Sequence, residues 1–328
     1  MLNVRGAALV AIAAAVALLA SGCSSAGEPA GGGSTAVDQV KVASIDVEGT
    51  IPLLIGEEQG IFKKHGIQVT STMSPAFDGT LASVMNGQAD VGFAASPPMI
   101  RAMVKGAPIT AVAQTAIISG EEQQAAVVAK DPSLKSPKDL VGKRVAVASL
   151  NDLASIGIRV AVAKDGGNPD GVQFVELPGP QRLPALTDGK VDAAIFIGAP
   201  AVSALKIDGV HLVFQYTEAL PAGSPLDMYF SKADFATGNA DLLKRFRAAM
   251  TEACEYANAN PDLVREHIRK LLTDVPEQAG VVDQLELTKY RTDINPKALM
   301  ELQDALVQYG GLEKTVSADR FFSFENGK

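Results

Sequence analysis

Short β-prone runs alternate with segments of helical spacing from residue 40 to residue 216. A first series of predicted strands covers residues 40–45, 66–72, 91–95 and 109–115, and a second series covers 143–149, 172–177, 192–197 and 211–216. The predicted helices between them cover residues 53–64, 80–85, 98–105, 154–164, 181–187 and 200–207. Strands that are separated by helices form parallel sheets with right-handed crossovers, so two such series predict two α/β lobes.

Two further β-prone runs lie beside proline or glycine, one between the two series and one after the second. They are AAVVAK (125–130) and DMYFSK (227–232), and we interpret them as strands that cross between the lobes and form a hinge. After residue 234 the pattern is wholly helical, with predicted helices at 241–257, 262–272, 276–288 and 296–309. These helices most simply cover the first lobe. The predicted lobe 1 is therefore residues 38–124 with 226–328, and the predicted lobe 2 is residues 125–225.

One sequence motif, which we call the doubled corner, occurs twice in the chain. Residues 81–103 align without a gap with residues 183–205. In each copy a predicted helix ends at Gly87 or Gly189, where a left-handed cap favours a residue without Cβ. Asp90 or Asp192 then opens a strand, and its carboxylate can accept hydrogen bonds from turn N–H groups. We interpret both positions as structural rather than functional.

The N-terminus is typical of an export signal. One cation, Arg5, precedes the unbroken apolar run 7–20, which is too short to span a bilayer but fits a signal-peptide hydrophobic region. The following LASGC sequence resembles the lipobox of bacterial lipoproteins, which implies a signal peptide at 1–22 and a lipid on Cys23. The alternative is a plain secretory signal with a chance cysteine. Residues 23–37 lack hydrophobic periodicity and are expected to be a flexible tether, which places the folded part outside the cytoplasm at the cell membrane.

Composition excludes one class of partner. The chain has 328 residues, a formal net charge of −8 and no clustered Lys or Arg, so nucleic acid is not an expected partner. Its length and its 47% hydrophobic content allow two cores. If Cys23 is acylated, Cys254 has no disulfide partner, and its place in a helical pattern predicts a buried small apolar residue.

Signals for catalysis are missing from the sequence. His65, His211 and His267 are far apart and have no metal-ligand spacing around them, and no Gly-x-Ser-x-Gly, P-loop or dinucleotide motif occurs. We therefore expect a protein that is not an enzyme, with no catalytic residue, no metal and no cofactor.

Three motifs resemble those of the extracytoplasmic substrate-binding proteins of ABC importers, in the branch that handles nitrate, sulfonates, taurine and thiamine-pyrimidine precursors. They are LIGEEQGIFKKHGI (54–67), LASVMNGQADVG (81–92) and DLVGKRVAV (139–147). The resemblance implies a two-lobed type II periplasmic-binding-protein fold, in which each lobe is a mostly parallel sheet flanked by helices. It also implies a monomer that closes around a small solute and delivers it to ABC permease and ATPase subunits, touching the membrane through its N-terminal lipid only.

Two other functions stay open beside that one. The same two-lobed fold occurs in enzymes, such as lyases or pyrimidine-precursor synthases, although the lipobox-like sequence argues against a cytosolic enzyme. A ligand-sensing partner of a membrane receptor would have the same sequence features as an importer component.

Ligand-binding residues are expected just after the strands, because ligands of open α/β sheets bind at the carboxyl edge. The polar and backbone candidates are Thr50, Asp78, Thr80, Ser96, Asn151, Asp152, Ser155 and Gly198, and the apolar candidates are Phe77 and Phe196. Thr80 and Ser155 have the alternative role of helix N-caps, and Phe196 lies inside a strand that favours a core position.

Charge in these loops is mostly negative. Apart from Arg182 they carry no cation, whereas Asp46, Glu48, Asp78 and Asp152 are acidic. A sulfonate or nitrate receptor could rely on helix N-termini alone, although a cation would normally help. The acids point instead to an amine or a nitrogen-containing heterocycle with several donors. The alternative is that they are solvated rim residues or helix caps. With no Trp in the chain, stacking on a ligand would need Tyr or Phe.

Overall fold

The computed structural model describes residues 37–119, 125–273 and 276–323. The predicted signal peptide, Cys23 and the tether up to residue 36 lie outside the described residues. Within the described part of the chain, no helix is both long and apolar enough to cross a membrane.

In these described ranges, ten strands form two five-stranded sheets with equivalent strand arrangements. The first sheet has the order β2-β1-β3-β10-β4 and contains β1 (Asp38–Ser44), β2 (Ile67–Met73), β3 (Val91–Ala95), β4 (Ile109–Ala113) and β10 (Asp227–Lys232). The second has the order β7-β6-β8-β5-β9 and contains β5 (Ala125–Ala129), β6 (Arg144–Val147), β7 (Gln173–Glu176), β8 (Ala193–Ile197) and β9 (His211–Gln215). Both predicted series of strands are confirmed, and the fold is the expected two-lobed α/β fold.

The prediction that two strands cross between the lobes was wrong. Strand β5 lies wholly in the second sheet, antiparallel to β8 and β9, and β10 lies wholly in the first, antiparallel to β3 and β4. All five residues of β5 and the first five of β10 are buried, so both strands need partners on both edges and cover on both faces. The chain therefore passes from one sheet to the other before each strand, not along it.

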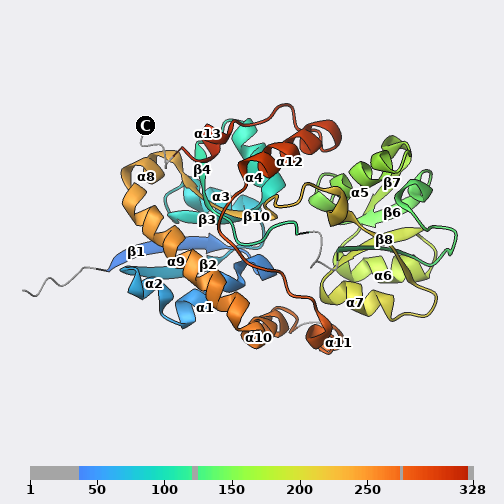
Figure 1. Cartoon of the computed structure of the whole chain (residues 1–328), viewed down its shortest axis with the longest axis horizontal. Coiled ribbons are helices and arrows are strands. Elements are labelled where there is room, and N and C mark those ends of the chain that lie inside the picture. The colour runs from blue at the N-terminus through green and yellow to red at the C-terminus, as the bar shows by residue number, and fades with distance from the viewer. Residues whose placement is uncertain (1–36, 120–124, 274–275, 324–328) are drawn as a thin grey trace, which may run out of the picture. The chain divides into compact units, whose positions relative to one another are not determined.

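Alternation within the strands decides which helices cover which face. In β5, Ala126 and Val128 pack with α6 (Gly179–Thr187) and α7 (Ala199–Leu205), whereas Val127 points to the opposite face with α5 (Leu153–Lys164). Figure 1 shows α6 and α7 on one side of this sheet and α5 on the other.

The first sheet is covered in the same way. Its one face packs against α1 (Ile51–Glu58), α2 (Ile61–Lys64) and α9 (Ala240–Ala259), and α9 lies across the strands in Figure 1. Its other face packs against α3 (Phe77–Met85), α4 (Ser96–Val104) and α12 (Pro296–Tyr309). The other described α-helices are α8 (Ala233–Gly238), α10 (Pro261–Leu271), α11 (Pro276–Ala279) and α13 (Ala318–Phe321). As expected, Cys254 is a buried member of an apolar cluster, between α1 and α10.

Two helix predictions were wrong in extent. The predicted helix 53–64 is broken by Gly60, which has a left-handed φ of 67° and separates α1 from α2. The predicted helix 276–288 ends early: α11 covers Pro276–Ala279, a single 3-10 turn covers Val282–Gln284, and no helix follows until α12. Tyr290 instead forms an isolated antiparallel bridge with Ala116 and buries its ring. Tertiary packing therefore overrides helix propensity in this segment.

The doubled corner has one structure in both lobes, which confirms its structural interpretation. Gly87 and Gly189 have φ values of 73° and 70°. Asp90 Oδ2 accepts a hydrogen bond from the backbone N–H of Lys41 at 2.8 Å, and Asp192 Oδ2 accepts one from Arg144 N–H at 2.8 Å. Each carboxylate thus ties the start of one strand to its parallel neighbour. In the second copy the Arg144 guanidinium also binds Asp192, at 2.9 Å from Nη2 to Oδ1.

Replacing Asp192 by Asn should lower stability at neutral pH by about 1 kcal/mol, because the charge-assisted bonds to Arg144 weaken. Arg144 holds the pKa of Asp192 below its usual range. A lowered folded pKa contributes stability above the unfolded pKa and loses it as pH falls through the folded value. The difference between wild type and Asp192→Asn should therefore disappear in acid. Urea unfolding at pH 7 and pH 3 measures this, with exposed Asp188→Asn as the control; an equal deficit at both pH values would contradict it.

Candidate functional site

A cavity of about 660 Å³ lies among the carboxyl ends of strands from both sheets. This is the size range of small-molecule pockets in proteins. One part of its wall comes from Asp46–Gly49 after β1, Ala95 at the end of β3 and Asp227 at the start of β10. Another part comes from residues 152–154 after β6 and Ile197–Gly198 at the end of β8. The cavity thus lies at the carboxyl edge of the strands, where a ligand site was expected.

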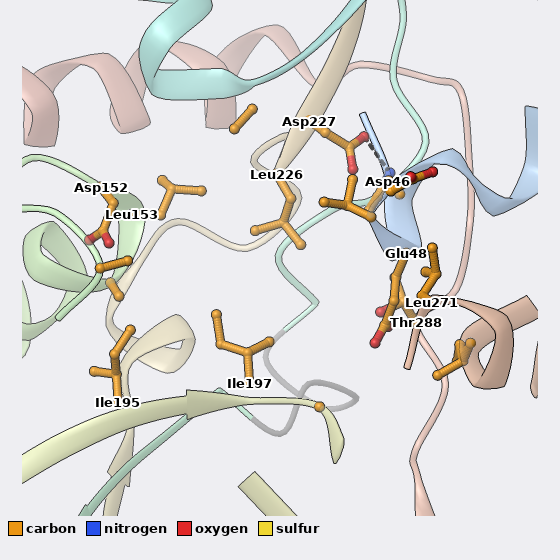
Figure 2. A pocket seen from close by; sticks show the side chains of 18 of the residues that line it. Asp46, Glu48, Asp152, Leu153, Ile195, Ile197, Leu226, Asp227, Leu271 and Thr288 are labelled. Carbon is orange, nitrogen blue, oxygen red and sulfur yellow. Dashed lines mark hydrogen bonds between the residues drawn. The ribbon is translucent and has the colours of Figure 1, made fainter. Parts of the chain in front are cut away.

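Aliphatic side chains make up most of the cavity wall. They include Leu153, Ile195, Ile197, Leu226, Leu271 and Leu285. Figure 2 shows Ile197 and Leu226 pointing toward one another into the cavity. Ile197 is 51% exposed although it belongs to a buried strand, so its side chain is free to contact a bound molecule.

Asp227 is the most deeply buried carboxylate of the cavity, with only 7% of the residue exposed. Its Oδ1 accepts hydrogen bonds from the backbone N–H groups of Thr115 (3.2 Å) and Ala116 (3.1 Å). The Thr115 hydroxyl lies 2.7 Å from Oδ1 and 2.6 Å from the carbonyl oxygen of Gly49. One hydroxyl hydrogen cannot serve two acceptors at once, so this contact supports the carboxylate only in part.

Burial raises the pKa of Asp227 to about 6, because loss of water outweighs the three hydrogen bonds to the carboxylate. The other oxygen, Oδ2, receives no hydrogen bond from any residue in the described part of the chain, and it lies against Gly49. A Cβ at residue 49 would stand 2.0 Å from Oδ2 and 3.1 Å from the Phe93 ring. Gly49 is therefore required for the carboxylate to occupy this place.

Glu48 is the second acid beside this position. Its backbone carbonyl accepts a hydrogen bond from the buried Tyr290 hydroxyl at 3.2 Å, which fixes the turn. Burial raises the pKa of the Glu48 carboxyl as well. Its Oε1 would lie 3.1 Å from a Cβ at Gly198, so Glu48 reaches the start of α7 across the cavity.

Acids outnumber bases on this wall. Among the described residues the lining carboxylates are Asp46, Glu48, Asp152, Asp227 and Glu286, and the lining cation is Arg182. Arg182 donates from Nε to the Leu177 carbonyl at 2.9 Å and from Nη1 to the Ile195 carbonyl at 3.4 Å. Burial lowers the pKa of its guanidinium, an effect that Asp152 partly offsets. Two of the five N–H groups of Arg182 are thus bound by backbone carbonyls, and the other three have no hydrogen-bond partner among the described residues.

Of the ten candidate ligand-binding residues, Asp152 and Gly198 line this cavity. Asp152 is the N-cap of α5 and accepts from Ser155 N–H at 2.8 Å. The hydroxyls of the four buried candidates donate to backbone carbonyls instead; these are Thr50, Thr80, Ser96 and Ser155. None of the four lines the cavity. Thr80 and Ser155 are not helix N-caps, whereas Thr50 is the N-cap residue of α1 but makes no side-chain capping bond.

The remaining four candidates also lie off the cavity wall. Phe77 packs edge-on against Phe230 at 5.9 Å between ring centroids, and Phe196 is 4% exposed in the core beside α6 and α7. Asp78 and Asn151 are exposed on the surface. Of the four acids that suggested an amine ligand, Asp46, Glu48 and Asp152 line the cavity and Asp78 does not.

Sequence reasoning missed Asp227, Tyr290 and the segment 285–288. An available signal for Asp227 was an acid that opens an otherwise apolar run, in DMYFSK. The segment 285–288 was hidden because its apolar spacing imitates a helix. Among the described residues, no three His, Cys, Asp or Glu side chains come together so that they could hold a metal ion.

Comparison with known proteins assigns the family. Residues 48–263, more than half of the chain, match the family described as NMT1/THI5 like. The chain belongs to the NMT1/THI5-like family. The matched residues include every described strand except β1, and also the start of α10, so they contain most of the cavity wall.

A curated relative is the taurine-binding periplasmic protein of Escherichia coli strain K12. It is 29% identical over 251 residues, which cover 75% of this chain and 74% of the relative. The crystal structure of the periplasmic aliphatic sulphonate binding protein SsuA from E. coli superposes with a TM-score of 0.72 at 17% identity, over 87% of this chain and 97% of that one. The alkanesulfonate-binding protein SsuA from Xanthomonas axonopodis pv. citri, bound to MOPS, gives 0.66 at 17% identity over 86% and 97%. These structures establish the periplasmic-binding-protein fold.

We expect the stability of the ligand-free Asp227→Asn variant, relative to wild type, to be higher at pH 7 than at pH 4. A folded pKa raised above the unfolded value contributes stability below the unfolded pKa, and that stability is lost as pH rises through about 6. The Asn variant lacks this loss. The difference in free energy of unfolding, variant minus wild type, should therefore increase by on the order of 2 kcal/mol between pH 4 and pH 7.

Chemical denaturation across pH 4 to 7 measures this gain, with the exposed Asp208→Asn as the control for net charge. Parallel stability curves for wild type and Asp227→Asn would show that Asp227 is not the buried, destabilised carboxylate described here.

Proposed function

We propose that this protein is the extracytoplasmic solute-binding component of an ABC importer. It captures a small organic solute in the 660 Å³ cavity and delivers it to a membrane permease that works with ATPase subunits. The observation that carries the proposal is the cavity itself, since both sheets of a periplasmic-binding-protein fold contribute their carboxyl edges to it. Membership of the NMT1/THI5-like family and the 29% identity to a periplasmic binding protein support the same function.

Capture works by closure of two lobes, residues 38–124 with 226–328 and residues 125–225. A solute that contacts Asp227 on one lobe and Ile197 on the other binds the closed form better than the open form. It therefore shifts the population toward closure by its difference in affinity.

Anchoring is part of the proposal and rests on the sequence. After removal of the signal peptide 1–22, a lipid on Cys23 holds a monomeric protein at the cell membrane through the tether 23–37. The protein thereby stays near its permease while residues 36–328, which form one compact unit, remain outside the cytoplasm.

A binding role is favoured over the enzyme alternative because the relatives reported above are named as binding proteins. A sensor that presents its solute to a membrane receptor would bind in the same way. Uptake of the solute by cells separates the two, because only the importer component is required for transport.

The first test is a melting-temperature screen of residues 36–328 with alkanesulfonates, taurine, nitrate, dicarboxylates, aromatic acids, amines and pyrimidines. A solute at a hundred times its dissociation constant should add about 2.7 kcal/mol, which is a shift of several degrees.

Ile197→Trp should abolish that shift, because the larger ring fills the cavity from an exposed position without disturbing the core. Leu212→Trp is the matched control, since Leu212 is 44% exposed on β9 of the same sheet and does not line the cavity. A panel without any hit, or a hit that survives Ile197→Trp, would count against the proposed function.

A further inference from the structure

We infer that Asp227 forms an ammonium subsite in this cavity, and that the solute is an organic cation whose protonated nitrogen is carried on an apolar body. The inference rests on the proposed function, because it takes the cavity as the solute site. It adds the chemical class of the solute and the residue that selects it.

The first argument is the position of the two carboxylate oxygens of Asp227. Oδ1 is fixed by two backbone N–H groups and the Thr115 hydroxyl, so the side chain has little freedom to turn away. Oδ2 receives no hydrogen bond from the described residues although 93% of the residue is removed from solvent. Figure 2 shows this carboxylate among the residues that line the pocket. A buried carboxylate with one free oxygen calls for a donor that carries positive charge.

The second argument is the space around Oδ2. Oδ2 occupies the room that the missing Cβ of Gly49 leaves, and the edge of the Phe93 ring borders the same place. The Tyr290 side chain, also on the cavity wall, is held by its hydroxyl at the Glu48 carbonyl. Aromatic rings beside a carboxylate attract a cation through their faces.

The third argument is the second carboxylate. No residue in the described part of the chain donates a hydrogen bond to the Glu48 carboxylate, which lies on the same wall as Asp227. Its Oε1 faces Gly198, so Glu48 adds negative charge to a different part of the same wall. Both carboxylates therefore favour a cationic solute over an anion.

The fourth argument concerns anions, which the cavity is poorly equipped to bind. Helix α4 starts with Ser96, whose N–H is bound to the Leu226 carbonyl at 3.0 Å, and continues with Pro97 and Pro98, which have no N–H. At α5 the Asp152 carboxylate already accepts from the first turn. Helix α4 therefore offers few free N–H donors, and at α5 the Asp152 carboxylate places a negative charge beside the first N–H groups of the helix.

The body of the solute follows from the remaining wall. Beyond the acids, the cavity is lined by leucine and isoleucine, with Ile197 and Leu226 exposed toward its centre. A sulfonate such as those named for the structural relatives would meet five lining carboxylates and a single lining cation, Arg182, among the described residues. An amine with an apolar chain or ring matches both parts of the wall.

The test compares three series of probes on the same chain: alkylamines, alkanols and alkanesulfonates from butyl to octyl, measured by calorimetry at pH 7.5 with residues 36–328. Alkylamines should bind, and more tightly as the chain lengthens, whereas the alkanols should bind weakly and the sulfonates not at all. Asp227→Asn should weaken amine binding about thirtyfold or more, the cost of losing one partner of a buried charge pair. Asp208→Asn, an exposed substitution of the same charge, should leave it unchanged.

A second variant keeps the test valid if Asp227→Asn alters folding. Gly49→Ala leaves every charge in place but displaces Oδ2, and it should weaken amines without affecting alkanols to the same extent. Gly238→Ala is its control, because a Cβ there meets nothing within 4 Å. Sulfonates that bind better than amines, amines that bind Asp227→Asn as well as wild type, or no binding by any series would each overturn the ammonium subsite. A hit from the wider solute screen would still support the proposed function in all three cases.

Discussion

The insertion of β10 between β3 and β4 is the constraint on which the rest of this structure depends. Strand β10 comes more than a hundred residues after its two neighbours and is antiparallel to both, so the first sheet is complete only after the second sheet has been formed along the chain. Strand β5 takes the equivalent central place in the second sheet. Two connections between the sheets are the necessary result, and they make a hinge possible. Because Asp227 is the first residue of β10, the same insertion brings a carboxylate to the carboxyl end of β3, where the cavity lies.

The doubled corner fixes the start of one strand in each sheet and its register with the parallel neighbour. The carboxylates of Asp90 and Asp192 each bind the N–H of a neighbouring strand, and the glycines before them let a helix end in a left-handed conformation. These contacts lie at the amino ends of β3 and β8, away from the cavity. The scaffold is therefore specified at one end of the strands, while the opposite end is free to vary in chemistry. Family motifs in the sequence lie mainly at the scaffold end, which is why they indicate the fold better than the solute.

Electrostatics of the cavity are dominated by acids. Carboxylates surround an apolar space, the one lining guanidinium gives two of its five N–H groups to backbone carbonyls, and prolines remove N–H donors at α4. Burial holds the pKa of Asp227 near 6, so at neutral pH its charge is maintained at a cost in stability. A group that destabilises the empty protein and has one free oxygen is typical of a binding site, because the ligand supplies the missing partner.

Local pattern in the sequence determined the elements, because a period of two or of 3.6 is a property of neighbouring residues. The strands, most of the helices, the two-lobed fold and the doubled corner all follow from it, and so does the acidic character that Asp46, Glu48 and Asp152 give to the cavity. The true extent of helix 276–288 did not follow, since Tyr290 pairs with Ala116, far away in the chain. The hydrogen-bond partners of four buried hydroxyls also did not follow from the pattern. Each of these hydroxyls donates to a backbone carbonyl inside the protein; they belong to Thr50, Thr80, Ser96 and Ser155. The role of Asp227 was decided only by tertiary structure, because Thr115, Gly49 and Phe93 meet its carboxylate from three distant segments, and long-range contacts leave no period in the sequence.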